Sequence, residues 1–63
     1  MYKIECTLYG KNKEGKRDKA YFPEASLYFY KEDFNEALAV KKMYEKMQFD
    51  VKLYKAEGWF YIG

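Results

Sequence analysis

A chain of 63 residues is long enough for one compact domain, residues 1–63, built from little more than a single helix layered on a small sheet. Its 49% hydrophobic and 22% aromatic residues exclude a disordered chain, and a net charge of only +2 is low for a dedicated binder of duplex nucleic acid. The absence of histidine and the single cysteine exclude an internal disulfide and a cysteine-based metal site, so we expect no metal and no cofactor.

The sequence also indicates where in the cell the protein is located. No segment approaches the ~20 apolar residues of a membrane span, and Lys3 and Glu5 interrupt any apolar signal-peptide core at the N-terminus. A lone cysteine fits a reducing environment. We therefore expect a cytoplasmic protein with no membrane partner.

Residues 1–9, MYKIECTLY, alternate as a half-buried strand does. The apolar set points to one face and the mixed set to the other: Tyr2, Ile4, Cys6 and Leu8 against Lys3, Glu5, Thr7 and Tyr9. Cys6 is therefore expected in the core, where a thiol is inert.

Residues 11–19, KNKEGKRDK, contain no apolar side chain and have Asn12 and Gly15 as turn residues. Five of the nine are basic: Lys11, Lys13, Lys16, Arg17 and Lys19. The first interpretation is a solvated, mobile hairpin loop; the alternative is a loop that contacts phosphates of a nucleic acid.

A second strand is predicted over residues 20–30, AYFPEASLYFY, with Pro23 near its start, which favours an edge position or a bulge. Beyond the proline, the two faces again differ, with Ala25, Leu27 and Phe29 on one and Ser26, Tyr28 and Tyr30 on the other.

The one helix is predicted within residues 31–48, starting near Phe34, because Asp33 and Glu36 have capping-box spacing. At 100° per residue one apolar stripe forms, which we interpret as core: Ala37, Val40, Met43, Tyr44 and Met47. Phe34 and Leu38 fall at its edge. No glycine ends the helix, so Gln48 is expected either to fray or to adopt the left-handed conformation at some cost.

Residues 49–62, FDVKLYKAEGWFYI, are predicted to form a closing hairpin whose second arm is apolar on both faces. A two-residue turn at Glu57-Gly58 and a four-residue loop over residues 55–58 place Tyr54, Trp59 and Tyr61 on one face. Phe49, Val51, Leu53, Phe60 and Ile62 then face the helix. A three-residue loop with a bulge would instead turn Trp59 and Tyr61 toward the face of Leu53; we favour the first register because it joins aliphatic to aliphatic residues.

These elements predict an α+β fold, a two-layer open-faced sandwich in which one helix covers one face of a four-stranded antiparallel sheet in the order β-β-α-β-β. The face away from the helix collects an aromatic set that we predict to be the partner-binding face: Tyr9, Tyr28, Tyr30, Lys52, Tyr54, Trp59 and Tyr61.

Catalysis is not expected from this chain. Without histidine neither Cys6 nor Ser26 has an ordinary general base, and the carboxylates form no recognisable acid pair. Glu5, the one acid placed on the aromatic face, is interpreted as a cross-strand partner of a lysine. No site for a small-molecule substrate is evident.

The function predicted is therefore non-catalytic protein association through the aromatic face, as a homodimer or as an inhibitor or regulator of a larger protein. By analogy, a small non-catalytic chain of this kind resembles the regulators of bacteriophages and mobile elements. The alternative is a nucleic-acid-binding module that stacks unpaired bases on the aromatic face and contacts phosphates through the loop 11–19. A third interpretation is a structural module in which that loop folds over the aromatic rings.

Overall fold

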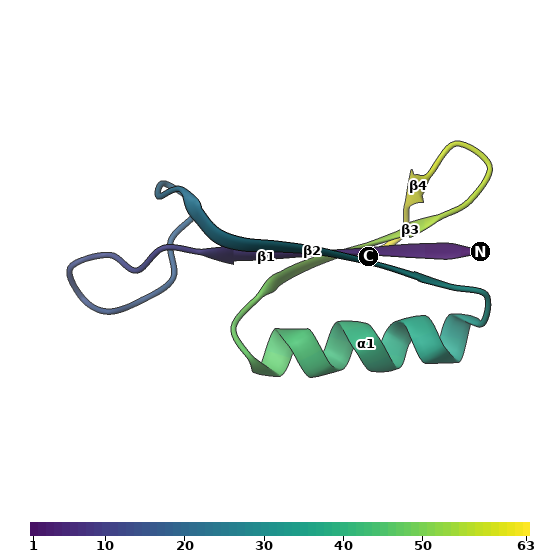
Figure 1. The fold of residues 1–63 in the computed structure, drawn as a ribbon, viewed down its shortest axis with the longest axis horizontal. Coiled ribbons are helices and arrows are strands. Elements are labelled where there is room, and N and C mark those ends of the chain that lie inside the picture. The colour runs from purple at the N-terminus through teal and green to yellow at the C-terminus, as the bar shows by residue number, and fades with distance from the viewer.

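A computed structural model describes all residues, 1–63, and confirms the predicted architecture. The elements follow in the order β1 (Tyr2–Tyr9), β2 (Pro23–Lys31), α1 (Phe34–Lys46), β3 (Asp50–Lys55) and β4 (Phe60–Tyr61). The four strands form one antiparallel sheet in the order β2-β1-β3-β4. Helix α1 lies along one face of this sheet, while the β3–β4 connection rises on the opposite side (Figure 1).

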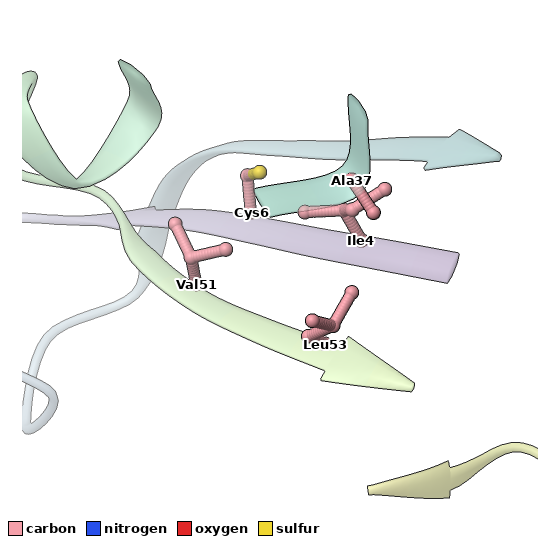
Figure 2. Close-up of a cluster of buried hydrophobic side chains, with 5 residues drawn as sticks. All are labelled: Ile4, Cys6, Ala37, Val51 and Leu53. Atoms are coloured by element: carbon pink, nitrogen blue, oxygen red, sulfur yellow. The ribbon is translucent and has the colours of Figure 1, made fainter. Parts of the chain in front are cut away.

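The core lies between α1 and the two central strands. Ile4 and Cys6 of β1 stand opposite Leu53 and Val51 of β3, and Ala37 of the helix packs on them (Figure 2). All five side chains are buried, Cys6 completely, as its place in the alternating pattern predicted. A partly buried aromatic and aliphatic rim surrounds this core: Tyr2, Phe29, Leu38, Val40, Tyr44 and Phe49.

The helix begins where its capping signal predicted. Asp33 has an extended backbone, and its carboxylate accepts a hydrogen bond of 3.2 Å from the backbone N–H of Glu36. This bond satisfies one of the N–H groups that the first turn leaves without a helical partner.

The helix ends in a Schellman motif without glycine. The N–H of Gln48 donates to the carbonyl of Glu45, and the N–H of Phe49 donates to the carbonyl of Tyr44. Gln48 has φ 68°, so it takes the left-handed conformation, the second of the two alternatives expected from the sequence. The rings of Tyr44 and Phe49 stack edge to face at 5.1 Å, which supplies the hydrophobic contact that usually accompanies this motif.

The predicted helix stripe is wrong at two positions. Met43 and Met47 are 52% and 48% exposed, whereas Ala37 is buried and Lys41 is half-buried. The reason is the orientation of the helix over the sheet: it is rotated so that Ala37 and Tyr44 point at the strands, and the two methionines lie on its flank. The apolar arc of the helix is wider than the part that the sheet buries, so the helical period alone does not show which part of the arc faces the sheet.

The 10–22 connection, predicted as a hairpin loop, contains hydrogen bonds of its own. The Asn12 side chain accepts hydrogen bonds from the N–H groups of Glu14 and Lys16, and Gly15 takes a left-handed φ of 78° at the turn. Lys11 and Arg17 form an isolated antiparallel bridge. The second strand accordingly begins at Pro23 and not at residue 20, after a register shift beside Leu8 and Tyr9.

Candidate functional site

The cross-strand register places one row of side chains over the full width of the face that α1 leaves uncovered. Lys3 of β1 stands between Tyr30 of β2 and Tyr54 of β3, and Tyr54 stands opposite Tyr61 of β4. In a sheet, residues directly opposite one another share a face. Since the flanking Ile4 belongs to the core, the row Tyr30-Lys3-Tyr54-Tyr61 points away from the helix.

Trp59 reaches this row from a loop. It lies in the β3–β4 connection with a left-handed φ of 54°, after Glu57 and Gly58, which also have positive φ. Because of this backbone path, the connection curls over the sheet on the side opposite α1 (Figure 1). The Trp59 ring meets that of Tyr30 edge to face, with centroids 5.9 Å apart.

The β3–β4 register is that of the two-residue turn predicted at Glu57-Gly58, because Lys55 stands opposite Phe60 and Tyr54 opposite Tyr61. The ladder stops at Lys55 and Phe60, so the connection comprises residues 56–59. The four-residue loop, which would pair Tyr54 with Trp59, differs from this register by two residues and would leave every side chain on the same face. Phe60, however, is 65% exposed and does not join the core as predicted, because it opposes Lys55 at the sheet margin.

Lys3 is the centre of the aromatic cluster. Its ammonium nitrogen lies 5.4 Å from the ring centroid of Tyr28, 5.5 Å from that of Tyr54 and 5.7 Å from that of Trp59. These distances are within the range in which a cation is attracted to the negative face of a ring. The charge of Lys3 thus draws together rings that come from three different segments of the chain.

We call this set the aromatic face, defined by Lys3, Tyr28, Tyr30, Tyr54, Trp59 and Tyr61. Tyr54 and Tyr61 are also in edge contact at 5.7 Å. Trp59 remains 40% exposed, and Tyr28, Tyr30 and Tyr61 are more exposed still. With about half of each side chain accessible, four rings leave roughly 400 Å² of aromatic surface in one patch.

Two residues predicted for the binding face stand apart from the cluster. Tyr9 is six residues from Lys3 along β1, about 20 Å away in an extended strand. It borders instead a shallow hollow of about 270 Å³ with Tyr21, Phe22 and Pro23. Lys52 lies on the same side of the sheet as the cluster and stands opposite Glu5, the cross-strand arrangement that was predicted for this acid.

The basic loop is also separate from the aromatic face. The 10–22 connection projects from one end of the sheet and the β3–β4 connection from the other, so it does not fold over the rings (Figure 1). Arg17 pairs with Glu24 and donates to the carbonyl of Tyr9 at 3.0 Å. Lys19 lies 3.6 Å from the Asp50 carboxylate. The other three basic residues of the loop are exposed and form no ion pair: Lys11, Lys13 and Lys16.

Lys3 is the residue whose role sequence reasoning missed. It was expected on this face only as one lysine among several polar neighbours. The cross-strand register could have identified it. Once β1 is placed at the centre of the sheet, antiparallel to both neighbours, Lys3 stands opposite a tyrosine on each side.

The remaining chemistry of the chain is limited. Burial raises the pKa of the Cys6 thiol, and the nearby Glu5 carboxylate adds to this effect. Histidine, cysteine and carboxylate side chains gather nowhere in groups of three that would suit a metal ion. Helix α1, with 13 residues, is the only helix, and no helix is long and apolar enough to cross a membrane.

Comparisons with models of protein families, with curated proteins and with solved structures found no match. The geometry of the aromatic face is therefore the basis for the functional argument.

Proposed function

We propose that this chain is a small non-catalytic binding protein that associates with protein through the aromatic face. The observation that carries this proposal is the gathering of five exposed or half-buried aromatic rings around one lysine on the side of the sheet that α1 leaves open. Tyrosine and tryptophan are enriched in the cores and hot spots of protein interfaces.

The cost of leaving this face in water supports the same proposal. Roughly 400 Å² of aromatic surface corresponds to about 10 kcal/mol at ~25 cal/mol per Å². This upper estimate is comparable to the whole stability of a small domain. A monomer that retained such a patch without a use for it would be prone to unspecific association.

The activity proposed is occlusion or regulation of a larger protein by the bound domain, in the cytoplasm, as in the small regulators of phages and mobile elements. Catalysis has no support from the side chains present: the thiol of Cys6 is buried and its pKa is raised, which removes the most nucleophilic group. Self-association through the aromatic face is the second form of this proposal. The affinity capture described below distinguishes it from the binding of a different protein.

The alternative function is binding of single-stranded nucleic acid. It is favoured by one observation, the exposed cations Lys11, Lys13 and Lys16 at the end of a sheet with an open aromatic face. Against it, Arg17 and Lys19 face acidic side chains, and the loop lies about 20 Å from the ring cluster.

The experiment compares three tagged proteins in affinity capture from cells that produce the chain: wild type, Trp59→Ala/Tyr61→Ala and the control Phe22→Ala. Phe22 is an exposed aromatic residue as well, but it lies in the 10–22 connection and not on the aromatic face. We expect a protein partner that the control retains and that the double variant loses. For a purified pair, Trp59→Ala alone should cost ~2 kcal/mol, about 30-fold in Kd.

Two controls separate the alternatives. Treating the lysate with nuclease should leave capture unchanged, whereas loss of the partner would favour nucleic acid. A fluorescence anisotropy titration with labelled single-stranded DNA at low salt should show no binding; tight binding that Lys11→Glu/Lys13→Glu/Lys16→Glu removes would replace the proposal. Equal capture by wild type and the double variant would eliminate the aromatic face as the interface.

A further inference from the structure

The two edges of the sheet are protected to very different degrees. At one edge β4 is only two residues long, and beyond it the N–H of Ile62 donates to Leu53 while the N–H of Leu53 donates to Gly63. Two residues thus oppose one, the arrangement of a β-bulge, which twists an edge away from pairing. At the other edge β2 runs for nine residues, Pro23–Lys31, with its outer side open.

The devices that usually prevent pairing of an edge stand only at the two ends of β2. Pro23 and the register shift beside it lie at the start of the strand and Lys31 lies at its end, and between Ala25 and Tyr30 there is no charged side chain. Leu27 on the helix side of this segment is 37% exposed. A long, uncharged and partly apolar edge is a template for a further strand.

The helix adds apolar surface beside this edge. Lys41 lies next to Gly63, at the β3–β4 side of the sheet, and the Tyr44 ring contacts Phe29 of β2 at 5.1 Å. Met43 and Met47 project from the opposite flank of α1 from Lys41, as a rotation of 100° per residue requires, and therefore border the β2 side. Their exposure is explained if this flank meets another molecule.

We propose that the open edge of β2 pairs antiparallel with the β2 edge of a second copy of this chain, making a continuous eight-stranded sheet. The register that overlaps the whole strand has its two-fold axis at Leu27. In this register Ala25 faces Phe29 and Ser26 faces Tyr28, so that small residues stand opposite large ones.

The size of the contact fits a weak, symmetric dimer. A nine-residue strand is about 30 Å long, and with the adjoining helix flank the contact is about 15 Å high, or roughly 900 Å² in total over both copies. This area is below that of standard specific interfaces and in the range of weak, transient association, so we expect a dimer that dissociates on dilution. A two-fold axis perpendicular to the sheet keeps both aromatic faces on one side, where they form a double-width surface that remains free.

The experiment is sedimentation equilibrium from micromolar to millimolar concentration with two charge variants at the axis, Leu27→Lys and Leu27→Glu. We expect wild type to dimerise and each variant alone to dimerise at least tenfold more weakly, because like charges would face each other. An equimolar mixture of the two variants should regain the dimer, since Lys then faces Glu. Phe60→Lys is the matched control: it places the same charge at an exposed position of the opposite edge and should dimerise as wild type does.

Three results would overturn the proposal: wild type that stays monomeric throughout, Leu27→Lys that dimerises as wild type does, or a mixture that remains monomeric. If a variant does not fold, hydrogen exchange of wild type decides. The amides of residues 24–31 that point away from β1 should become protected as the concentration rises. Unchanged exchange at these amides would contradict pairing. Trp59→Ala/Tyr61→Ala should leave the dimer intact. A dimer that is lost in that double variant but kept in Leu27→Lys would show that self-association uses the aromatic face. Failure of the edge proposal is therefore distinguishable from failure of the proposed function.

Discussion

Tyr30 and Trp59 place their ring centroids 5.9 Å apart although one residue lies on the edge strand β2 and the other in the loop beyond β3. Strands β1 and β3 lie between them in the sheet, and Lys3 of β1 places its ammonium nitrogen 5.7 Å from the centroid of the Trp59 ring. The contact therefore joins the last hairpin to the first two strands by side chains alone. It makes the aromatic face one connected surface.

Removing the charge of Lys3 should loosen this surface. In Lys3→Met, which keeps most of the chain length, the attraction to three rings is lost and we expect about 0.5–1 kcal/mol less stability in urea unfolding. Since Trp59 is the only tryptophan, its emission should also shift to the red as the ring becomes more mobile and hydrated. Lys52→Met, on the same face, is the control and should leave the emission unchanged; equal shifts in both variants would contradict the central role of Lys3.

The C-terminus of α1 can be stabilised by a single change. Gln48 has φ 68°, a conformation that costs energy for a residue with Cβ and little for glycine. Gln48→Gly should raise the unfolding free energy by about 0.5–1 kcal/mol, or Tm by about 4–8 °C per kcal/mol for a domain of this size. Thermal unfolding followed by circular dichroism measures it, and Gln48→Ala, which retains the strain, should give no gain. A lower Tm for the glycine variant would show that the left-handed strain is not limiting.

The N-cap of α1 should be equally measurable. Asp33→Ala removes the acceptor of the 3.2 Å hydrogen bond from the N–H of Glu36, and we expect a loss of ~1 kcal/mol in chemical denaturation. Asp33→Asn keeps an acceptor oxygen and should recover most of this loss. If the asparagine variant were as unstable as the alanine variant, the helix dipole and not the hydrogen bond would account for the effect.

The buried thiol of Cys6 should make stability depend on alkaline pH. Its folded-state pKa is raised, mainly by burial, so the neutral form is favoured in the fold. The contribution is then fully present below the unfolded thiol pKa of ~8.5 and is lost as pH rises through the higher folded value. The unfolding free energy of wild type minus that of Cys6→Ala should be constant up to about pH 8 and should fall above it.

Tyrosines and lysines also titrate at high pH, which is why the difference between the two proteins is the quantity to measure. A difference that stays flat to about pH 10 would contradict the raised thiol pKa. Thiol-directed labelling offers an independent check: in native wild type it should be limited by opening of the fold and should accelerate when denaturant is added.

Local chemistry was sufficient to predict the elements of this protein. Alternation with period two identified residues 1–9 as a half-buried strand with Cys6 inward, and the spacing of Asp33 and Glu36 located the helix start. These signals depend only on neighbours within a few residues, so contacts with distant parts of the chain do not alter them. The same alternation predicted that each of the first two strands has one apolar face and one face with polar and tyrosine side chains.

Positions that depend on distant partners were decided only by tertiary structure. The rotation of α1 exposes Met43 and Met47, because the sheet and not the helix sequence selects which part of a wide apolar arc is buried. Tyr9 belongs by pattern to the face of Lys3, but the length of β1 carries it to the far end of the sheet. Arg17 pairs with Glu24 because the 10–22 connection folds back and brings Arg17 beside the start of β2.

Composition and periodicity were enough to predict a two-faced sheet with one helix and more aromatic residues than one core can hold, because both are properties of the chain. Which of those rings meet depends on the tertiary structure. Trp59 reaches Tyr30 and Lys3 through the left-handed loop and the strand order β2-β1-β3-β4, neither of which is encoded within a short window of residues.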